Sequence, residues 1–353
     1  YWAEGFFHHN CGKSTLCEAL SVNKKHILAK STIRGFHSGF STGDNTQDNS
    51  LLSKLRDKTL ITKDGDTLLQ SPNLSQILSE GRDIYDGVSR THYRNAMSKD
   101  YEGVRMTWIL CGTSSLRSID NSELGERFLD CVIMEIIDDE LEDEILSRVA
   151  HRADRNVSLE TDGKVTTHYD PALVQAMSLT GGYIDSLKEN TATKLEAIEM
   201  PTRSLQKCIR LGKFVAFLRA RPSVHQDENA ERELASRLVS QHIRLAKCLS
   251  LVLNHSTVNE VVMKRIKRIA LDTSRGITLD ITNQLHEEEL EARALAIRLG
   301  KVQTLVSKLL RFLQQIGVVE NFRVEKVKGL RTTPKWRLTE KMSKLYSDVM
   351  EDL

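Results

Sequence analysis

The stretch Asn10-Cys11-Gly12-Lys13-Ser14-Thr15 decides the fold expected of this chain. A loop that binds phosphate needs backbone N–H groups free to face the phosphate oxygens, and Gly12 permits that close approach. Lys13 brings a mobile positive charge, and the Ser14 hydroxyl is placed to ligate Mg²⁺. An amphipathic helix continues over residues 14–21 and would point its positive end at the phosphates. We therefore predict that all six residues bind a nucleoside triphosphate, ATP, together with Mg²⁺.

The match to a full phosphate-binding loop is incomplete. The pattern G-x-x-x-x-G-K-[ST] places its first glycine at position 7, where this chain has Phe7, and Gly5 lies two residues too early. Either residues are missing near the start of the sequence, or the loop is unusual. A plain helix N-terminus is the alternative interpretation of a bare G-K-S-T.

The second motif is acidic. A hydrophobic strand expected at residues 59–63 is followed directly by Asp64. A carboxylate at the end of such a strand would hold the hydration shell of Mg²⁺ against the phosphates, so Asp64 is the second predicted metal ligand after Ser14. A glutamate that polarises the attacking water would usually come next, but this chain has Gly65. We predict that Asp66 takes that role, or that the base lies elsewhere. A strand ending in an Asp-Gly-Asp turn is the alternative.

The first 137 residues alternate short apolar runs with helical segments, as an α/β domain does. The runs at residues 26–32, 59–63, 106–111 and 131–137 are apolar on both faces, which suits a buried parallel sheet. Helices are expected at residues 14–21, 73–85 and 122–128. We predict an α/β core over residues 1–150 and a helical domain over residues 151–275.

Residues 276–353 change character again. Two short helices, at residues 291–299 and 301–315, are followed by two strands at 318–320 and 336–338 that flank a basic loop. This order of elements is that of a winged helix, with residues 301–315 as its recognition helix. The basic loop would contact DNA phosphates, with Lys326, Lys328, Arg331 and Lys335 as the candidate residues. Winged helices also dock proteins, so a protein partner is the alternative.

The order of these parts resembles AAA+ ATPases, in the branch with MCM-like and MoxR-like members, over about residues 5–255. In that family a polar residue after the third strand, called sensor 1, orients the attacking water, and Thr113 is the matching position, with Ser114 beside it. Residues 121–128 resemble the segment that carries the family's arginine finger, which implies that role for Arg127. Such a guanidinium would neutralise charge on a neighbouring subunit's γ-phosphate. The alternative for Arg127 is a surface salt bridge with Glu123 or Glu126.

The resemblance also implies a helical lid and an oligomer. Residues 233–238 resemble the lid helix that carries a sensor 2 arginine, which makes Arg237 the candidate and Arg203 the runner-up. Because Arg127 could not complete its own subunit's site, the resemblance implies a homo-oligomeric ring, expected to be a hexamer.

Two further loops could face a partner. Residues 35–40 place Phe36 and Phe40 between glycines, and aromatic side chains there could stack on bases or grip a chain in a central pore. The alternative is a turn whose Phe residues pack inward. Residues 99–105, before the sensor 1 strand, form the other candidate contact, beside Arg90, Arg94 and Lys99; a solvated helix face is the alternative there.

Charge and cysteine content narrow the partners. Lys and Arg number 50 against 48 Asp and Glu, so no global field selects nucleic acid or a membrane, and DNA would need a local patch. The six cysteines form no C-x-x-C pair, which favours a reducing, cytoplasmic compartment over a zinc site or disulfides. No apolar run approaches the roughly 18 residues of a membrane span. Because the chain begins at Tyr1, we expect a fragment of a longer protein or residues missing near its start.

Three functions fit these features. The first is an oligomeric ATPase motor that acts on DNA, such as a helicase or replication ATPase. The second is a switch in which ATP controls assembly or the remodelling of a partner protein, for example in defence. The third is a winged-helix transcription regulator with an ATPase-like module as its sensor.

Overall fold

The computed structural model describes most of the chain, in two compact units: unit 1, Tyr1–Thr191, and unit 2, Ala192–Leu353. The described residues are 2–7, 13–38, 48–92, 98–104, 106–113, 115–116, 127–133, 143–144, 146–147, 150, 157–159, 165–167, 171–220, 235–274, 276–322 and 334–350. The division falls after residue 191, whereas the sequence analysis placed boundaries after residues 150 and 275. The difference arises because the helix at residues 171–188 belongs to unit 1, whereas the helices after residue 191 belong to unit 2.

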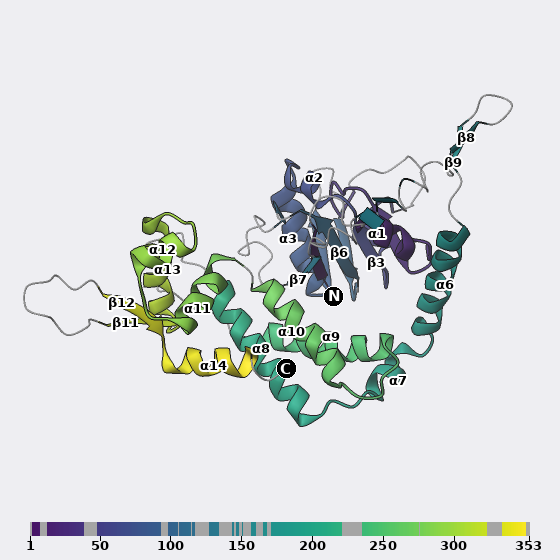
Figure 1. Cartoon of the computed structure of the whole chain (residues 1–353). Coiled ribbons are helices and arrows are strands. Elements are labelled where there is room, and N and C mark those ends of the chain that lie inside the picture. The colour runs from purple at the N-terminus through teal and green to yellow at the C-terminus, as the bar shows by residue number, and fades with distance from the viewer. Residues whose placement is uncertain are drawn as a thin grey trace, which may run out of the picture. The chain divides into compact units, whose positions relative to one another are not determined.

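Unit 1 is built on a parallel sheet whose described strands run in the order β2-β3-β6-β1-β7 (Figure 1). The strands are β1 (Trp2–Phe7), β2 (Ile27–Lys30), β3 (Thr59–Thr62), β6 (Thr107–Gly112) and β7 (Phe128–Ile133). Each neighbouring pair is parallel. The predicted parallel α/β core is therefore confirmed.

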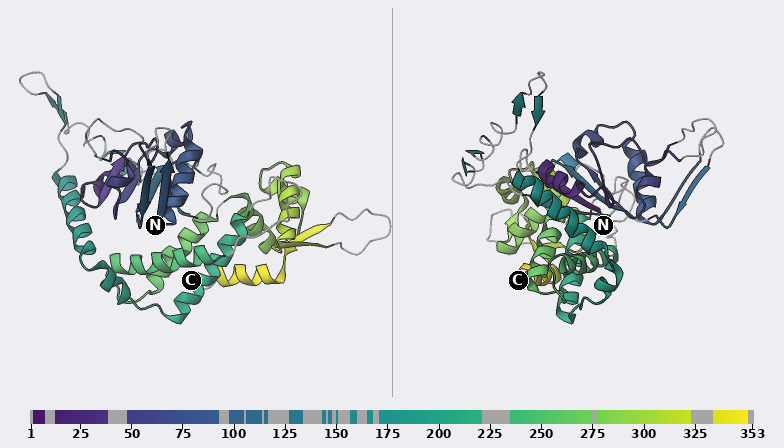
Figure 2. Two further views of the ribbon diagram at one scale, coloured as in Figure 1. Left: turned by 180° about the vertical axis from the view of Figure 1, so that it is seen from behind. Right: turned by 90° about the vertical axis from the view of Figure 1, so that its right-hand side faces the viewer.

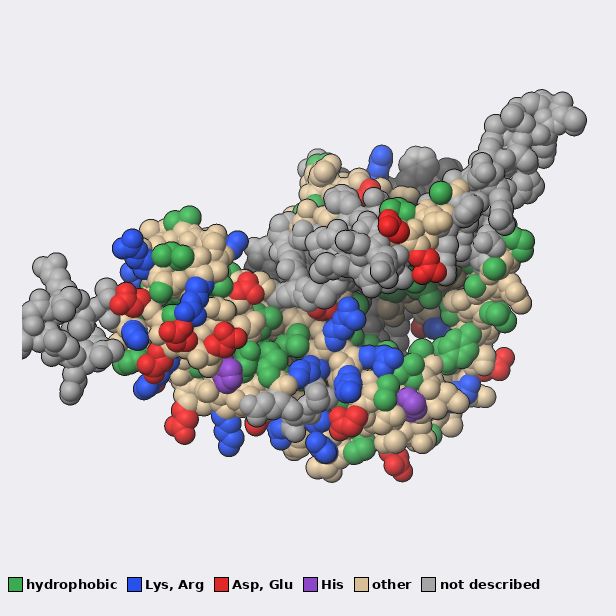
Figure 3. Space-filling model, in the orientation of Figure 1, with side chains coloured by type: hydrophobic (Ala, Val, Ile, Leu, Met, Phe, Trp, Pro, Cys, Tyr) green, Lys and Arg blue, Asp and Glu red, His purple; other side chains and the backbone are tan. Residues whose placement is uncertain are grey.

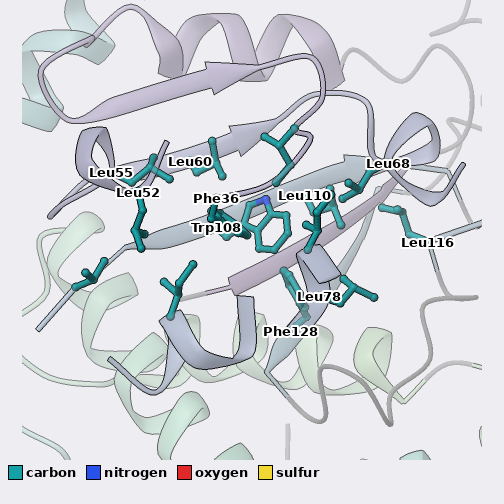
Figure 4. Close-up of a cluster of buried hydrophobic side chains, with 14 of the residues drawn as sticks. Phe36, Leu52, Leu55, Leu60, Leu68, Leu78, Trp108, Leu110, Leu116 and Phe128 are labelled. Carbon is teal, nitrogen blue, oxygen red and sulfur yellow. The ribbon is translucent and has the colours of Figure 1, made fainter. Parts of the chain in front are cut away.

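Side chains of the inner strands alternate between two apolar layers, because successive residues of a strand point to opposite faces. On β6, Trp108 and Leu110 belong to the larger layer, whereas Cys111 belongs to the smaller one. Figure 4 shows the larger layer around Trp108. Phe36 meets the Trp108 ring edge-on, with centroids 5.3 Å apart and planes at 88°. The indole Nε1 donates to Thr62 Oγ1 at 2.9 Å, so this buried polar atom is satisfied.

Helices cover both faces of the sheet. The larger layer packs against α2 (Gly65–Leu69) and α3 (Leu74–Tyr85), and the smaller layer against α1 (Lys13–Ser21) and α6 (Pro171–Lys188). Helix α6 lies beside α1 although it is far away in sequence (Figure 2). Asn23 Nδ2 donates to the Gly181 carbonyl at 3.0 Å, and His26 Nε2 lies 3.1 Å from Asp185 Oδ1. These contacts place α6 in unit 1 and not with the helices that follow.

The structure contains strands that the sequence did not predict. The central strand β1 was missed because Glu4 and Gly5 interrupt its apolar run; its hydrogen-bond partners on both sides, β6 and β7, establish it. A hairpin of β4 (Val88–His92) and β5 (Ser98–Glu102) stands before β6, and β8 (Val157–Leu159) pairs with β9 (Val165–Thr167). Strand β7 begins at Phe128, which had been assigned to a helix over residues 122–128; residues 122–126 lie outside the described part.

Unit 2 begins with helices. They are α7 (Thr191–Glu196), α8 (Thr202–Arg219), α9 (Ser236–Val252) and α10 (Glu260–Thr273), and the last three pack against one another. Helices α8 and α9 cross closely at Gly212, where an added Cβ would lie 2.5 Å from Val239 Cγ2. The described residues from 171 to 274 are mostly helical, as expected of a helical domain over residues 151–275, but β8 and β9 at the start of that range are strands.

The chain then forms α11 (Ile277–Glu287), β10 (Leu290–Glu291), α12 (Ala292–Arg298), α13 (Gln303–Gln315), β11 (Val319–Phe322), β12 (Lys335–Leu338) and α14 (Glu340–Met350). The short strands form an antiparallel sheet in the order β10-β12-β11. Helix α14 returns to α8, and Lys267 Nζ of α10 donates to the Met350 carbonyl at 2.8 Å. The predicted order of two helices and a hairpin is observed, but these elements share one compact unit with α8–α10.

Candidate functional site

Asp64 and Thr113, two of the predicted site residues, lie at the carboxyl edge of the sheet in unit 1. Asp64 comes two residues after β3, and Thr113 directly follows β6. Strands β3, β6 and β1 are parallel neighbours, so their carboxyl ends meet at one edge. Open α/β sheets bind ligands at this edge.

Helix α1 begins at the same edge. Cys17 Sγ lies 3.3 Å from Cys111 Sγ, one residue before the end of β6. Because α1 follows β1 and runs back along the sheet, its first turn, which begins at Lys13, lies beyond the strand ends. Asn10, Cys11 and Gly12 lie outside the described residues, and the side chains of Lys13, Ser14 and Thr15 are not described either. The placement of α1 thus agrees with the predicted loop, and the roles of these side chains stay predictions.

Asp64 caps helix α2. Its Oδ1 accepts from the Thr67 backbone N–H at 3.1 Å, and its Oδ2 accepts from the Thr67 hydroxyl. The Asp64 N–H donates to the Ser31 carbonyl at 2.9 Å, which extends the pairing of β2 with β3. The carboxylate is exposed, and each of its oxygens keeps a lone pair for a further donor or a cation.

Asp66 and Thr113, predicted separately, are direct partners. The Thr113 N–H donates to Asp66 Oδ2 at 2.9 Å, and the Thr113 hydroxyl donates to Oδ1 at 2.9 Å. Ser115 Oγ lies 3.0 Å from the Thr113 hydroxyl and was not foreseen as part of this group. The structure therefore joins the carboxylate after β3 to the polar residue after β6 in one rigid arrangement.

Close packing explains why Gly65 follows Asp64. A Cβ at Gly65 would lie 2.9 Å from the Cys111 carbonyl oxygen, 2.8 Å from Leu116 Cδ2 and 2.9 Å from Leu110 Cδ1. No larger side chain fits without movement of the backbone of β6 or of both leucines. A glutamate at this position would therefore force its neighbours to move, and Asp66 is the nearest carboxylate that follows.

Arg127 lies at the opposite, amino edge of the sheet, directly before Phe128, which pairs with Trp2 at the start of β1. Its Nη2 donates to Asp86 Oδ2 at 2.8 Å, its guanidinium lies 5.5 Å from the Tyr85 ring centroid, and the residue is 7% exposed. The salt bridge is therefore with Asp86; the expected alternatives, Glu123 and Glu126, lie outside the described residues. A six-residue strand spans about 20 Å, so Arg127 cannot reach its own subunit's candidate site.

The two lid candidates belong to unit 2. Arg237 is half-buried in the first turn of α9, and Arg203 is exposed in the first turn of α8. Whether either one approaches a nucleotide stays a prediction.

The two segments expected to contact a partner, residues 35–40 and 99–105, lie beside a polar cluster that was not predicted from the sequence. Phe36 is fully buried in the core, which contradicts the stacking role and confirms for this residue the alternative that it packs inward; Phe40 lies outside the described residues. Next to it, His37 Nε2 lies 2.8 Å from Ser89 Oγ of β4. Burial lowers the pKa of His37, partly offset by the Glu80 carboxylate, so the imidazole is neutral near pH 7.

Asp48 is the centre of this cluster. Its carboxylate accepts from Lys99 Nζ and from the Tyr101 hydroxyl of β5, and from the Ser50 N–H at 3.0 Å. Burial alone would raise the pKa of Asp48, but these hydrogen bonds together hold the pKa well below its usual range. Lys99, expected as a DNA or pore contact, instead forms an ion pair with Asp48. Arg90 pairs with Glu102 across the hairpin at 3.1 Å, and Arg94 and Arg105 lie outside the described residues.

Of the candidate DNA residues, only Lys335 is described; Lys326, Lys328 and Arg331 lie outside the described part. Lys335 is half-buried at the start of β12. On the same strand, Arg337 donates from Nε to Glu320 Oε1 at 2.7 Å and lies 4.8 Å from the Phe322 ring centroid. Arg337 is thus engaged within its own sheet.

Comparison with known proteins identifies no relative: no family model matches the chain, and no curated protein matches its sequence. In the described part of the chain, no helix is both long and apolar enough to cross a membrane. The described His, Cys, Asp and Glu residues form no group of three that could hold a metal ion by themselves.

Proposed function

We propose that the protein is an ATPase of the AAA+ type that works as an oligomer on DNA. One observation carries the proposal: the start of α1, which bears G-K-S-T, lies at the same sheet edge as Asp64, Asp66 and Thr113. The structure supplies a positive helix end and two carboxylates at that edge, and the sequence adds the lysine and hydroxyls of G-K-S-T; together these are the groups that phosphoryl transfer from a nucleotide requires.

Within the proposed site, each group has a distinct task. Lys13 and the amides near Gly12 hold the terminal phosphates of ATP. Asp66, held by Thr113, accepts a proton from the attacking water, while the water oxygen bonds to the γ-phosphorus and the bond to the β-phosphate oxygen breaks. The products are ADP and phosphate. Thr113 keeps the Asp66 carboxylate turned toward the water.

The residues also fit Mg²⁺. This ion usually binds one or two carboxylates together with substrate phosphates and water, so a complete cage of protein ligands is not required. Asp64 is exposed at the strand end and retains free lone pairs, and Ser14 is the predicted hydroxyl ligand. The ion would neutralise charge that develops on the phosphates.

Titration calorimetry with ATP and Mg²⁺, combined with steady-state hydrolysis, tests this proposal. We expect Lys13→Ala to abolish binding and Asp66→Asn to retain binding but lose at least 100-fold in turnover, the range of a general base. Lys24→Ala, on an exposed lysine just beyond α1, is the matched control and should behave as the wild type. A folded wild-type protein that does not bind ATP would refute the proposal.

DNA is the proposed substrate because unit 2 has the helix order and sheet of a winged helix. Helix α13 buries Val306, Leu310 and Leu313 and exposes Lys308 and Arg311, so a cationic face is available for a DNA groove. We expect DNA to stimulate ATP turnover and to be retained at low salt. Unchanged turnover together with no retained DNA would remove DNA from the proposal, and saturable preference for one sequence would favour a transcription regulator.

Arg127 supports an oligomer because it lies at the edge opposite its own site. We propose that the Asp86 pair opens on assembly and that Arg127 enters the neighbouring subunit's site, in a ring expected to be a hexamer. Mixing Arg127→Ala with Lys13→Ala subunits should restore part of the turnover that each variant lacks alone. Absence of any recovery, with mixed oligomers shown by mass measurement, would contradict this role.

A second candidate function is a slow switch in which bound ATP controls assembly or a partner protein. The packing around Gly65 favours it, because that packing leaves no room for a glutamate beside Asp64 unless its neighbours move. Rapid hydrolysis that Asp64→Asn abolishes would count against the switch.

A further inference from the structure

The three packed helices α8, α9 and α10 concentrate positive charge in a chain whose total is nearly balanced. Helix α8 carries five Lys and Arg residues, α9 carries three and α10 carries four. Their only carboxylates are Glu260 and Asp272, both on α10. The whole chain, by contrast, has 50 Lys and Arg against 48 Asp and Glu. The excess is therefore local to these helices.

Burial places much of this charge on the outer faces of α9 and α10. Helix α9 buries Leu238, His242 and Ala246, whereas Arg244 is exposed and Lys247 is half-buried on the opposite face. Helix α10 likewise turns residues such as Ile266 inward, while Lys264, Arg265 and Arg268 are exposed. Lys and Arg side chains gather over α9 and α10 in the middle of the surface view (Figure 3). We call five of the exposed and half-buried cations of these two helices, Arg244, Lys247, Lys264, Arg265 and Arg268, the basic face.

The described carboxylates of these helices neutralise at most one cation of this face, Arg268. Glu260 is held by Lys207 Nζ at 2.9 and 3.2 Å, and Lys207 is a buried residue of α8. Asp272 is 1% exposed, and its Oδ2 lies 4.0 Å from Arg268 Nε. No ion pair joins Arg244, Lys247 or Lys264 to any described residue. Exposed cations of this kind neutralise DNA phosphates and release the counterions condensed on the DNA, which favours binding.

We propose that the basic face binds the phosphate backbone of duplex DNA, as a contact additional to the winged helix of the same unit. The partner rests on the proposed DNA function, but the contact does not require ATP hydrolysis. Lysine and arginine side chains on a helical surface contact phosphates, and phosphate contacts carry no sequence information, so this face is expected to bind DNA without sequence preference. It would hold DNA to unit 2 whichever sequence lies under α13.

The test is the salt dependence of DNA binding, measured by fluorescence anisotropy on a labelled duplex without nucleotide. A triple variant, Arg244→Ala with Lys247→Ala and Lys264→Ala, should lower the slope of log affinity against log salt by about 2.7, and weaken binding on the order of 10²-fold at 0.1 M salt. The charge-keeping triple Arg244→Lys, Lys247→Arg and Lys264→Arg should bind as the wild type. It also controls for changes in folding, together with circular dichroism.

A matched control removes three exposed cations of unit 1, by Lys24→Ala, Lys54→Ala and Arg56→Ala, and should leave the slope unchanged. An unchanged slope in the basic-face variant would overturn the inference, as would an equal loss in the unit 1 control. A face that binds anionic phospholipid vesicles but no duplex would also overturn it. ATP calorimetry on the same variant separates the outcomes, because failure of the proposed ATPase leaves the salt slope intact.

Discussion

Substitution of Gly65 by alanine tests whether close packing, rather than a catalytic requirement, explains the glycine beside Asp64. The new methyl carbon would lie 2.8–2.9 Å from two leucine methyls and from the Cys111 carbonyl oxygen. Favourable carbon contacts begin at about 3.5 Å, so each neighbour must retreat by roughly 0.7 Å. Such overpacking costs about 1–3 kcal/mol, against a gain of at most about 1 kcal/mol from helix propensity. We expect a net loss of about 1–2 kcal/mol.

The assay is urea unfolding followed by tryptophan fluorescence in a Trp336→Phe background, in which the remaining Trp2 and Trp108 both report on unit 1. Gly182→Ala is the control, because its Cβ meets nothing within 4 Å inside α6, and it should stabilise the unit by about 0.5–1 kcal/mol. Gly65→Glu should be less stable still and should not raise ATP turnover. Wild-type stability in Gly65→Ala, or a faster Gly65→Glu enzyme, would refute the packing argument.

Three more predictions concern buried or half-buried polar groups. Burial lowers the pKa of His242 to about 4, so between pH 6.5 and 4 the unfolded chain binds one more proton than the folded chain. The free energy of unfolding, measured by urea titration, should therefore fall by about 2 kcal/mol from pH 6.5 to 5. His242→Gln should show a flatter pH profile, and coinciding profiles would contradict this prediction. Thr62→Val leaves the Trp108 N–H without its acceptor and should lower the free energy of unfolding by about 1–3 kcal/mol, whereas Thr62→Ser should be milder. The hydrogen bond from Lys99 helps to hold the pKa of Asp48 below its unfolded value, so its contribution to stability is present above about pH 4 and is lost as pH falls. Asp48→Asn should increase hydrogen exchange in β4 and β5 at pH 7. Unchanged exchange would contradict the stabilising role of Asp48.

Local patterns were sufficient for the elements whose burial is regular. The apolar runs after residues 26, 59 and 106 identified β2, β3 and β6, and helical spacing identified α3 and most helices of unit 2, although α11 and α14 were not foreseen. Strand β1 escaped because its Glu4 and Gly5 break the pattern, and pairing on both sides compensates for them. The hairpin of β4 and β5 escaped because its strands are mostly polar and exposed, so no apolar alternation marks them.

For the candidate site, residue type and position relative to strand ends were enough to select Asp64, Asp66 and Thr113, because the carboxyl ends of parallel strands must share an edge. Their actual partners depended on distances that no local pattern contains. The bond between Asp66 and Thr113, the commitment of Arg127 to Asp86 and the exclusion of any side chain at Gly65 each join segments more than 40 residues apart. Only packing of the folded sheet and helices brings such segments to within a few ångströms, and so only the tertiary structure decided them.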